Sequence, residues 1–182
     1  MVDWHTFKYN ILRYMNNQEA ANEDALARFI TDEYDKAMSG AEIILTKNKI
    51  TSSNKWMFWK HMHDGFISAK EIPEGEGAAD SIFRKAISDA AIAYWTGAIM
   101  SSKYYGRLPG HIGFIPPCVV TNPGMCSYIA PRPANNMDSS LPFVDALVDC
   151  FKRHLLTITG IHTMIRPPTP SGPYPLVWTG IK

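Results

Sequence analysis

Two histidines and an aspartate stand close together in the segment HMHD, at His61, His63 and Asp64. On a β-strand both imidazoles would point to the same side, which could begin a zinc site. We expect this segment to be helical, so that the two rings diverge. The sequence also has no CxxC pair and no HExxH motif. We therefore interpret the histidines as a surface or partly buried pair and expect no metal and no other cofactor.

The cysteines offer a second chemistry, nucleophilic catalysis by Cys118 or Cys150 with His111 or His154 as the base. A reactive thiol needs a neighbouring base or cation that lowers its pKa, and no local motif supplies one. Cys150 lies between apolar residues of an expected helix, where a cysteine is typically a small core residue. With Cys126 the cysteines are three, at scattered spacing, which predicts free thiols and a reducing compartment. We expect no enzymatic activity.

Basic and aromatic residues interleave in a third segment, which has no acidic residue between Glu42 and Asp64. Such a pattern can follow a phosphate backbone and stack nucleic-acid bases. The residues that would make this contact are Lys55, Trp56, Trp59 and Lys60. The alternative is that the tryptophans pack inward and the lysines are solvated.

Composition limits the class of protein. The chain has 182 residues, of which 46% are apolar and 19% charged, and this predicts one globular domain with a substantial core. A net charge of +1 argues against a surface that seeks polyanions in general. The longest nearly apolar stretch, AAIAYWTGAIM, is shorter than the roughly 20 residues that cross a bilayer. We expect a cytosolic protein without a membrane segment or leader.

Apolar residues at helical spacing predict a helical first half and one further helix near the end. The predicted helices cover residues 4–15, 26–37, 56–67 and 80–102, and the last runs from Ser140 to Gly160. Asn17 and Asn22 are candidate caps. The helix over 80–102 is apolar almost all round in its second half, so we expect it to be central.

Two further expectations concern single helix faces. In the third predicted helix, Trp56, Trp59, His63 and Phe66 share one face, although Gly65 is unfavourable there. In the second helix, the run DEYDK places three carboxylates opposite the apolar side chains. We interpret DEYDK as a solvated face.

Prolines and glycines break every helical period between residues 106 and 135. Within this region, CVVT and MCSYI flank Pro123 and Gly124, which suit the centre of a type II turn, so a short β-hairpin is expected. The segments LPGHIGFIPP and TGIHTMIRPP resemble each other, and each predicts extended chain after a helix. The expected fold is mainly α with a small β-hairpin element, an α+β class, in a single domain over 1–166.

The ending PPTPSGPYPLVWTGIK, residues 167–182, combines prolines with apolar side chains. We expect an extended C-terminal arm that docks on a neighbouring subunit, because proline lowers the entropy lost on docking. The alternative is that the arm folds back over its own domain. The expected contact residues are Pro173, Tyr174, Leu176, Val177, Trp178 and Ile181.

In overall order the chain resembles small virion proteins of tailed bacteriophages. The likeness rests on a helix ending in FITDEYDKAMSG, a core helix carrying AAIAYWTG, the segment HIGFIPPCVVTNPG, and a last helix before a proline-rich end. The resemblance implies a head-to-tail connector (neck) or tail-completion protein in a homo-oligomeric ring, with portal, connector or tail proteins as neighbours. It also implies a location in the virion, and in the host cytoplasm during assembly.

These observations support three hypotheses. The first is a virion structural subunit, which the layout and the arm favour. The second is a DNA-binding accessory protein that uses the lysines and tryptophans named above. The third, least favoured, is an enzyme that uses a cysteine or the HMHD cluster.

Overall fold

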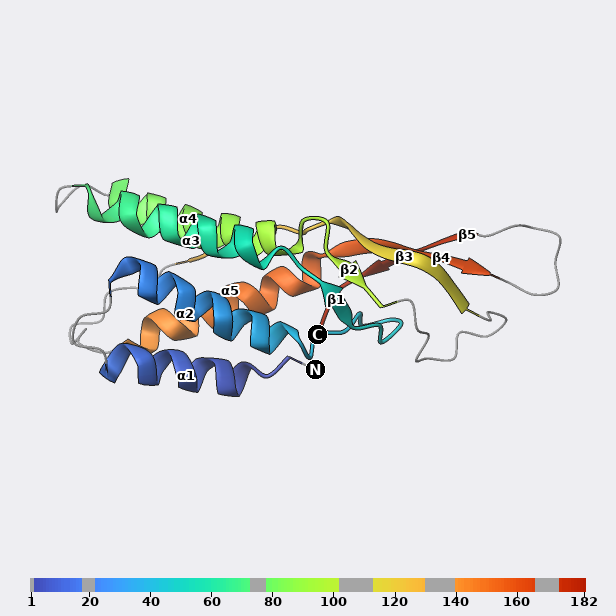
Figure 1. Cartoon of the computed structure of the whole chain (residues 1–182), viewed down its shortest axis with the longest axis horizontal. Helices are drawn as coiled ribbons and strands as arrows, with labels where there is room; N and C mark the ends of the chain where they lie inside the picture. Colours follow the sequence, from blue (N-terminus) through green and yellow to red (C-terminus); the bar gives the residue numbers. More distant parts are fainter. Residues whose placement is uncertain (1, 18–21, 73–77, 102–112, 130–139, 166–173) are drawn as a thin grey trace.

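The computed structural model of the chain describes residues 2–17, 22–72, 78–101, 113–129, 140–165 and 174–182 (Figure 1). Its elements follow the chain in the order α1 (Trp4–Asn17), α2 (Glu23–Met38), β1 (Ile50–Ser52), α3 (Lys55–Lys70), α4 (Ala78–Trp95), β2 (Ile99–Met100), β3 (Gly113–Asn122), α5 (Leu141–Thr157), β4 (Thr159–Ile165) and β5 (Tyr174–Thr179).

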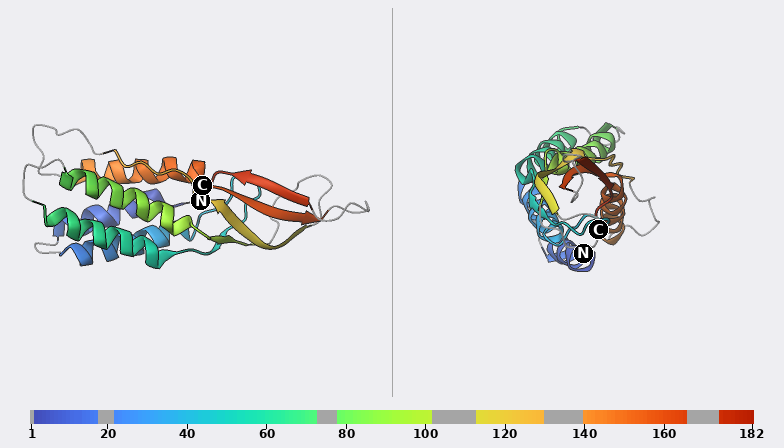
Figure 2. Two further views of the ribbon diagram at one scale, coloured as in Figure 1. Left: turned by 90° about the horizontal axis from the view of Figure 1, so that it is seen from above. Right: turned by 90° about the vertical axis from the view of Figure 1, so that its right-hand side faces the viewer.

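The helices and the sheet occupy different ends of an elongated molecule (Figures 1 and 2). The described strands form one antiparallel sheet in the order β1-β2-β3-β4-β5. The predicted class, mainly α with a small β part, is confirmed. The sheet is larger than the predicted hairpin, because segments far apart in the sequence pair with one another.

The centre of the core is an aromatic cluster around Tyr34, which is fully buried. Its ring lies 4.6 Å from that of Phe58, 4.6 Å from that of Phe151 and 5.0 Å from that of Tyr94. The Trp95 indole N–H donates to the Tyr34 hydroxyl at 3.1 Å. Each aromatic pair adds roughly 0.5–1.5 kcal/mol beyond the area that it buries. The cluster joins α2, α3, α4 and α5. The end of the fourth predicted helix lies in the core, but the helix is not covered on all sides, since Ile92 and Ala93 line an open groove.

Gly65 explains how closely α3 and α4 approach each other. A Cβ added at Gly65 would lie 2.1 Å from the Cβ of Ala86, far inside van der Waals contact. Glycine costs a helix about 1 kcal/mol relative to alanine. Glycine is therefore required at position 65, because any larger side chain would push α3 away from α4.

The four residues expected to share one face of α3 differ in burial, since Phe66 is buried and Trp56 is exposed. The buried row is Phe58, Met62 and Phe66, and Trp56 is 62% exposed. Trp56 and Trp59 do share a side, but this side faces outward beside α2. Because α3 packs against both α2 and α4, the row that points between these two helices is the one that is buried.

The interpretation of DEYDK as a solvated face is also wrong in part. Glu33 is only 4% exposed, and its carboxylate accepts a hydrogen bond of 2.6 Å from the Asn10 side chain on α1. Asp35 accepts one of 2.8 Å from the hydroxyl of Tyr94 on α4. Helices on both sides of α2 therefore cover part of the polar face that the helical periodicity assigns to solvent.

The helix predicted over 80–102 ends earlier, at Trp95. Gly97 follows with φ of 72°, a left-handed conformation that glycine adopts readily. Ile99 and Met100 then form β2 and pair with Val119 and Cys118 of β3. These two apolar residues were expected to belong to a helix covered on all sides. They point instead to opposite faces of a strand, with Met100 buried and Ile99 exposed.

Two predicted helix starts are confirmed. The Asn22 side chain accepts a hydrogen bond of 2.8 Å from the Ala25 N–H at the start of α2. Ser140 precedes α5, with Pro142 in the first turn. The expected end of α5 is wrong, since the helix ends at Thr157 and Gly160 lies within β4.

The hairpin predicted around Pro123 and Gly124 is wrong. Strand β3 pairs with β4, and residues 123–129 form no strand. The Met125 N–H instead donates to the Thr157 hydroxyl of α5 at 2.9 Å. Parts of the two similar segments pair with each other, since residues 113–115 of β3 lie opposite residues 163–165 of β4.

The described part of the predicted arm belongs to the domain itself. Residues 166–173, including Pro173, lie outside the described residues. Strand β5 then pairs with β4 along its length. Beyond it, the Ile181 N–H donates to the Leu155 carbonyl at 2.9 Å. The alternative, in which this segment folds back over its own domain, holds for residues 174–182.

Candidate interaction surfaces

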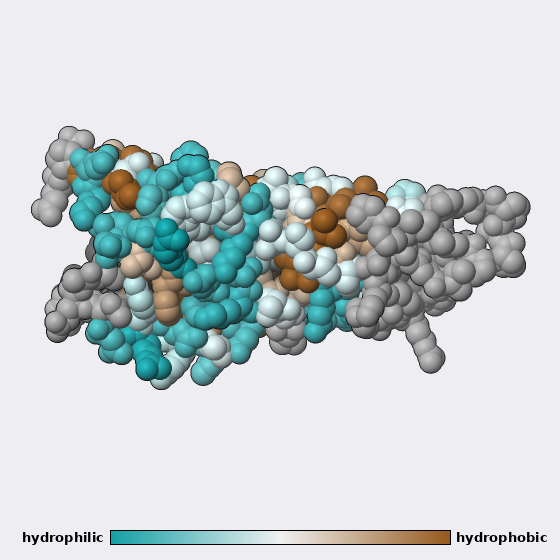
Figure 3. Space-filling view, in the orientation of Figure 1, coloured by the Kyte–Doolittle hydropathy of each residue, from teal (hydrophilic) through white to brown (hydrophobic). Residues whose placement is uncertain are grey.

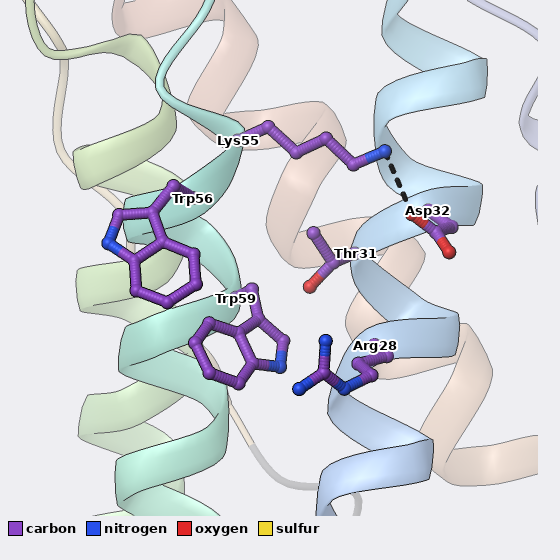
Figure 4. A pocket seen from close by; sticks show the side chains of 6 residues that line it. All are labelled: Arg28, Thr31, Asp32, Lys55, Trp56 and Trp59. Atoms are coloured by element: carbon purple, nitrogen blue, oxygen red, sulfur yellow. Dashed lines mark ion pairs between the residues drawn. The ribbon is translucent and has the colours of Figure 1, made fainter.

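One exposed cluster, the tryptophan patch, consists of Arg28, Trp56 and Trp59 and lies where α2 and α3 run side by side (Figure 4). The two indole rings are 4.4 Å apart and tilted by 37°. The Arg28 guanidinium lies 4.7 Å from the centre of the Trp59 ring. Such a cation–π contact contributes about 0.5–1 kcal/mol at exposed sites. The contact holds Trp59 in place and leaves Trp56 the most exposed ring of the patch.

An open pocket of about 300 Å³ lies beside the tryptophan patch, between α2 and α3. Its volume is at the lower end of the range for ligand pockets, which begins at about 300 Å³. The residues that line it are Arg28, Thr31, Asp32, Lys55, Trp56 and Trp59 (Figure 4). Tryptophan and arginine are the residue types that contribute most at protein interfaces, so the composition suits a protein partner.

The lysines proposed for nucleic-acid contact are already paired with carboxylates. Lys55 lies 2.8 Å from Asp32 and 3.3 Å from Asp35, and the hydrogen bond with Asp32 raises the Lys55 pKa. Lys60 pairs with Asp64 one helical turn away. Contact with phosphate would have to compete with these carboxylates. The segment itself has no acidic residue, but its lysines find partners outside it, in Asp32 and Asp35 on α2 and in Asp64 at its end.

A second surface, the aliphatic row, crosses four strands on the outer face of the sheet. Cross-strand pairing places Ile99 opposite Val119, Val119 opposite Ile161, and Ile161 opposite Val177. Ile99 is 38% exposed and Val177 is 64% exposed. Figure 3 shows apolar surface in this part of the molecule, where the sheet leaves the helices. The row is a continuous band of β-branched side chains directed away from the core.

The opposite face of the same strands is buried, which explains why the row points outward. Successive side chains of a strand alternate between the two faces of the sheet. Met100, Cys118, Val120 and Trp178 all lie on the inner face and are at most 6% exposed. The inner face belongs to the core, and the residues between these positions necessarily face outward.

The predicted contact residues of the C-terminal segment therefore separate into two groups. Trp178 and Ile181 are each 1% exposed, so the prediction that they anchor on another subunit is wrong. They satisfy their need for burial within their own chain. Leu176 is partly buried against the core, and Val177 is exposed at the end of the aliphatic row. Of Tyr174, only the backbone in β5 is described.

The histidines of HMHD diverge, as expected for a helix. His63 contacts Asp64 at 3.1 Å and its ring lies 5.0 Å from that of Trp59. His61 lines a different groove, between α3 and α4, together with Asp89. Among the residues with defined placement, no three His, Cys, Asp or Glu side chains form a group that could hold a metal ion.

The cysteine and histidine pairs considered for catalysis are occupied otherwise. Cys118 is buried, and this burial raises its pKa to about 11. The Nε2 of His154 contacts the Pro123 carbonyl at 2.7 Å. His111 lies outside the described residues. Cys150 contacts the thiol of Cys126, a pairing that the scattered spacing of the cysteines does not indicate.

Sequence reasoning located Trp56, Trp59 and Val177 but missed Arg28, Ile99 and Ile161. Arg28 joins the tryptophan patch only through the packing of α2 on α3, for which the sequence has no local signal. The alternation in TGIHTMI, where Ile161 stands between Gly160 and His162, is a signal that could have identified a strand with two different faces.

No family model, no curated protein and no solved structure matches the chain. Within the part of the chain that the structure describes, none of the helices combines the length and the apolar character needed to span a membrane.

Proposed function

We propose that the chain is a structural subunit that assembles into a homo-oligomeric ring of a tailed-phage virion, as a head-to-tail connector or tail-completion protein. Its function is to bind protein neighbours rather than to catalyse a reaction. The phage assignment rests on the resemblance in the sequence. The assembly itself is argued from the two surfaces.

The aliphatic row is the observation that carries this proposal. Burying one aliphatic side chain completely contributes roughly 1.5–3 kcal/mol, so four in register could contribute several kcal/mol to an interface. Val177 lies on β5, which is the last strand of the sheet order. The row therefore extends to an edge, where a neighbouring molecule can cover it without displacing a described strand.

A ring needs two different surfaces on each subunit, because a head-to-tail contact joins unlike patches. The tryptophan patch on α2 and α3 is the second surface. Its Arg28 and the neighbouring Lys55 are already paired with Asp24 and Asp32, so a partner that covers the patch buries no unpaired charge. The uncharged row of one copy is a suitable partner for the tryptophans of the next.

Complementation between two variants tests this contact directly. Trp56→Lys disables the tryptophan patch, and Val177→Lys disables the aliphatic row. Each variant alone is expected to be monomeric, because every contact needs both surfaces. An equimolar mixture should form heterodimers and nothing larger, since each variant retains the surface that the other has lost. Native mass spectrometry distinguishes these species.

Tyr9→Lys and Leu156→Lys are the matched controls, since Tyr9 and Leu156 are each 57% exposed and lie outside both surfaces. They should assemble like the unmodified protein. Failure of the mixed variants to form a heterodimer, although each is folded by circular dichroism, would refute the head-to-tail contact.

Membership in a virion needs a separate measurement. Purified particles of the phage that encodes this protein should contain it at a fixed number of copies per portal ring, as measured by quantitative mass spectrometry. Particles that lack the protein would overturn the phage assignment and leave the assembly claim to be judged on its own.

A further inference from the structure

Cys126 and Cys150 place their sulfur atoms 3.0 Å apart, although they are 24 positions apart in the chain. Cys150 lies on α5 and is buried, whereas Cys126 lies in the segment 123–129 after β3 and is partly exposed. Neither thiol is in a disulfide. The pair thus combines a partly exposed cysteine with a buried one, with their sulfur atoms at contact distance.

The residues before Cys126 are held against α5. The Nε2–H of His154 can donate to the Pro123 carbonyl at 2.7 Å, and the Met125 N–H donates to the Thr157 hydroxyl at 2.9 Å. Gly124, with φ of 84°, lies so close to α5 that an added Cβ would be 2.5 Å from the Thr157 hydroxyl oxygen. The residues before Cys126 are therefore in close contact with α5 and are held there by two hydrogen bonds.

The residues after Cys126 are held against α4 and the start of α5. The Tyr128 N–H donates to the Ser88 hydroxyl at 3.1 Å. The Tyr128 ring packs 6.1 Å from Phe83 and 6.3 Å from Phe143. Because Cys126 is fixed from both sides, the two sulfurs have to approach by only about 1 Å to reach the length of a disulfide bond.

The two thiols differ in acidity. A hydrogen bond from Cys126, and the nearby positive charge of Arg153, lower the pKa of Cys150. The same hydrogen bond, together with burial, raises the pKa of Cys126. Cys118 is buried away from this pair, and its pKa is raised to about 11. Because the thiolate is the attacking species, the raised pKa of Cys126 makes its reaction with an oxidant the slow step. The positive charge of Arg153 remains beside Cys150 after Cys126 has reacted, and it favours the thiolate of Cys150.

We propose that Cys126 and Cys150 form a reversible intramolecular disulfide with a low-molecular-weight disulfide as oxidant, and that this bond fastens the segment 123–129 to α5. In the first step the thiolate of Cys126, the less buried of the two cysteines, attacks one sulfur of the oxidant, and the first small thiol leaves with the proton that Cys126 has lost. In the second step Cys150 attacks the Cys126 sulfur, and the second small thiol leaves with the Cys150 proton. The two cysteines lose two electrons in total, which the oxidant gains.

Equilibration of the full-length reduced protein with mixtures of reduced and oxidised glutathione tests this proposal. After acid quenching and alkylation, the oxidised protein should retain one alkylated cysteine, Cys118. Its intact mass should be lower by two hydrogen atoms before alkylation, and a peptide pair linked through Cys126 and Cys150 should be found. The melting temperature should rise by roughly 5–10 °C, as for a loop of this length, and dithiothreitol should reverse the rise.

Variants assign the roles of the two sulfurs. Cys150→Ser should retain one glutathione on Cys126, because the second step is blocked, and Cys118→Ala should behave like the unmodified protein. If Cys150→Ser does not fold, Cys126→Ser serves instead and should form no intramolecular bond. Three alkylated cysteines in the unmodified protein at the most oxidising glutathione ratio would overturn the proposal. A product linked between two chains would overturn it as well.

Discussion

The Trp178 indole lies against the backbone of Gly160 on the neighbouring strand, so closely that no other residue fits at position 160. A Cβ added there would be 2.1 Å from the Trp178 ring and 2.4 Å from the Val119 carbonyl oxygen. Trp178 is thereby buried between β5 and the core. This contact explains why the proline-rich ending joins the sheet through its own tryptophan.

Gly160→Ala should therefore destabilise the protein strongly. Overpacking typically costs 1–3 kcal/mol, and a clash with backbone as well as side chain places the expected loss at about 3 kcal/mol or more in urea unfolding. The matched control is Gly97→Ala. Gly97 has a φ of 72°, unlike Gly160, but no atom lies within 4 Å of an added Cβ, so this change should cost only about 1–2 kcal/mol through backbone strain. Equal losses in both variants would mean that Trp178 does not depend on the space at Gly160.

Gly65→Ala should lower stability even though alanine is the better helix former. In an exposed helix the change would gain about 1 kcal/mol. Here the new methyl group would meet Ala86 of α4 at 2.1 Å, and we expect a net loss of about 1–3 kcal/mol. Ser68→Ala, at an exposed position of the same helix, should be neutral or stabilising. A stabilised Gly65→Ala variant would show that α3 and α4 pack less closely than described.

Stability should fall on mild acidification because of two buried histidines. Burial lowers the pKa of His154 to about 4 and that of His162 to about 4, from 6.5. The unfolded chain therefore binds protons that the folded protein does not. The free energy of unfolding should be fully retained above about pH 6.5 and should decrease toward pH 4, by about 1.4 kcal/mol per pH unit for each histidine.

His154→Gln isolates one of these two contributions. The glutamine amide can still donate to the Pro123 carbonyl but does not titrate. In urea unfolding at a series of pH values, the variant should lose about half of the pH dependence that the histidines produce. An unchanged slope would show that His154 is not buried in its neutral form.

The ion pairs on α3 predict weak binding of nucleic acid. Because Lys55 and Lys60 are paired with carboxylates, single-stranded DNA should bind weakly, with little dependence on salt, in fluorescence anisotropy. The DNA-binding alternative predicts the opposite. If binding is tight, and if Lys55→Ala reduces the salt slope by about one unit, then the lysine contacts phosphate and the alternative regains its support.

Local physical signals are sufficient for much of the fold. Helical spacing identifies the helices, and Asn22 and Pro142 mark two helix starts, because caps and first-turn prolines act through neighbouring backbone. The strands and their pairing could not be predicted in the same way. Ile99 and Met100 follow a helix after only Thr96, Gly97 and Ala98, and β3 pairs with β4 about forty residues later in the sequence. Pairing between distant segments depends on topology, which single-residue propensities do not encode.

The candidate surfaces could be predicted only in part, for the same reason. The aromatic and basic character of the segment around Trp56 is visible in the sequence, but the carboxylates that pair with Lys55 come from α2. The need of Trp178 for burial was recognised correctly, whereas the partner that buries it, Gly160, lies in its own chain. Val177 remains on the surface because it alternates with Trp178 along β5.

The account depends most on the claim that the aliphatic row is covered by a second copy of the chain. Sedimentation velocity of the unmodified protein over a range of concentrations tests this directly. A closed oligomer of fixed mass is expected, and Val177→Lys should reduce it to monomers that keep their circular dichroism spectrum. A single monomeric species up to about 100 μM, which would limit self-association to less than about 5.5 kcal/mol, would contradict the claim.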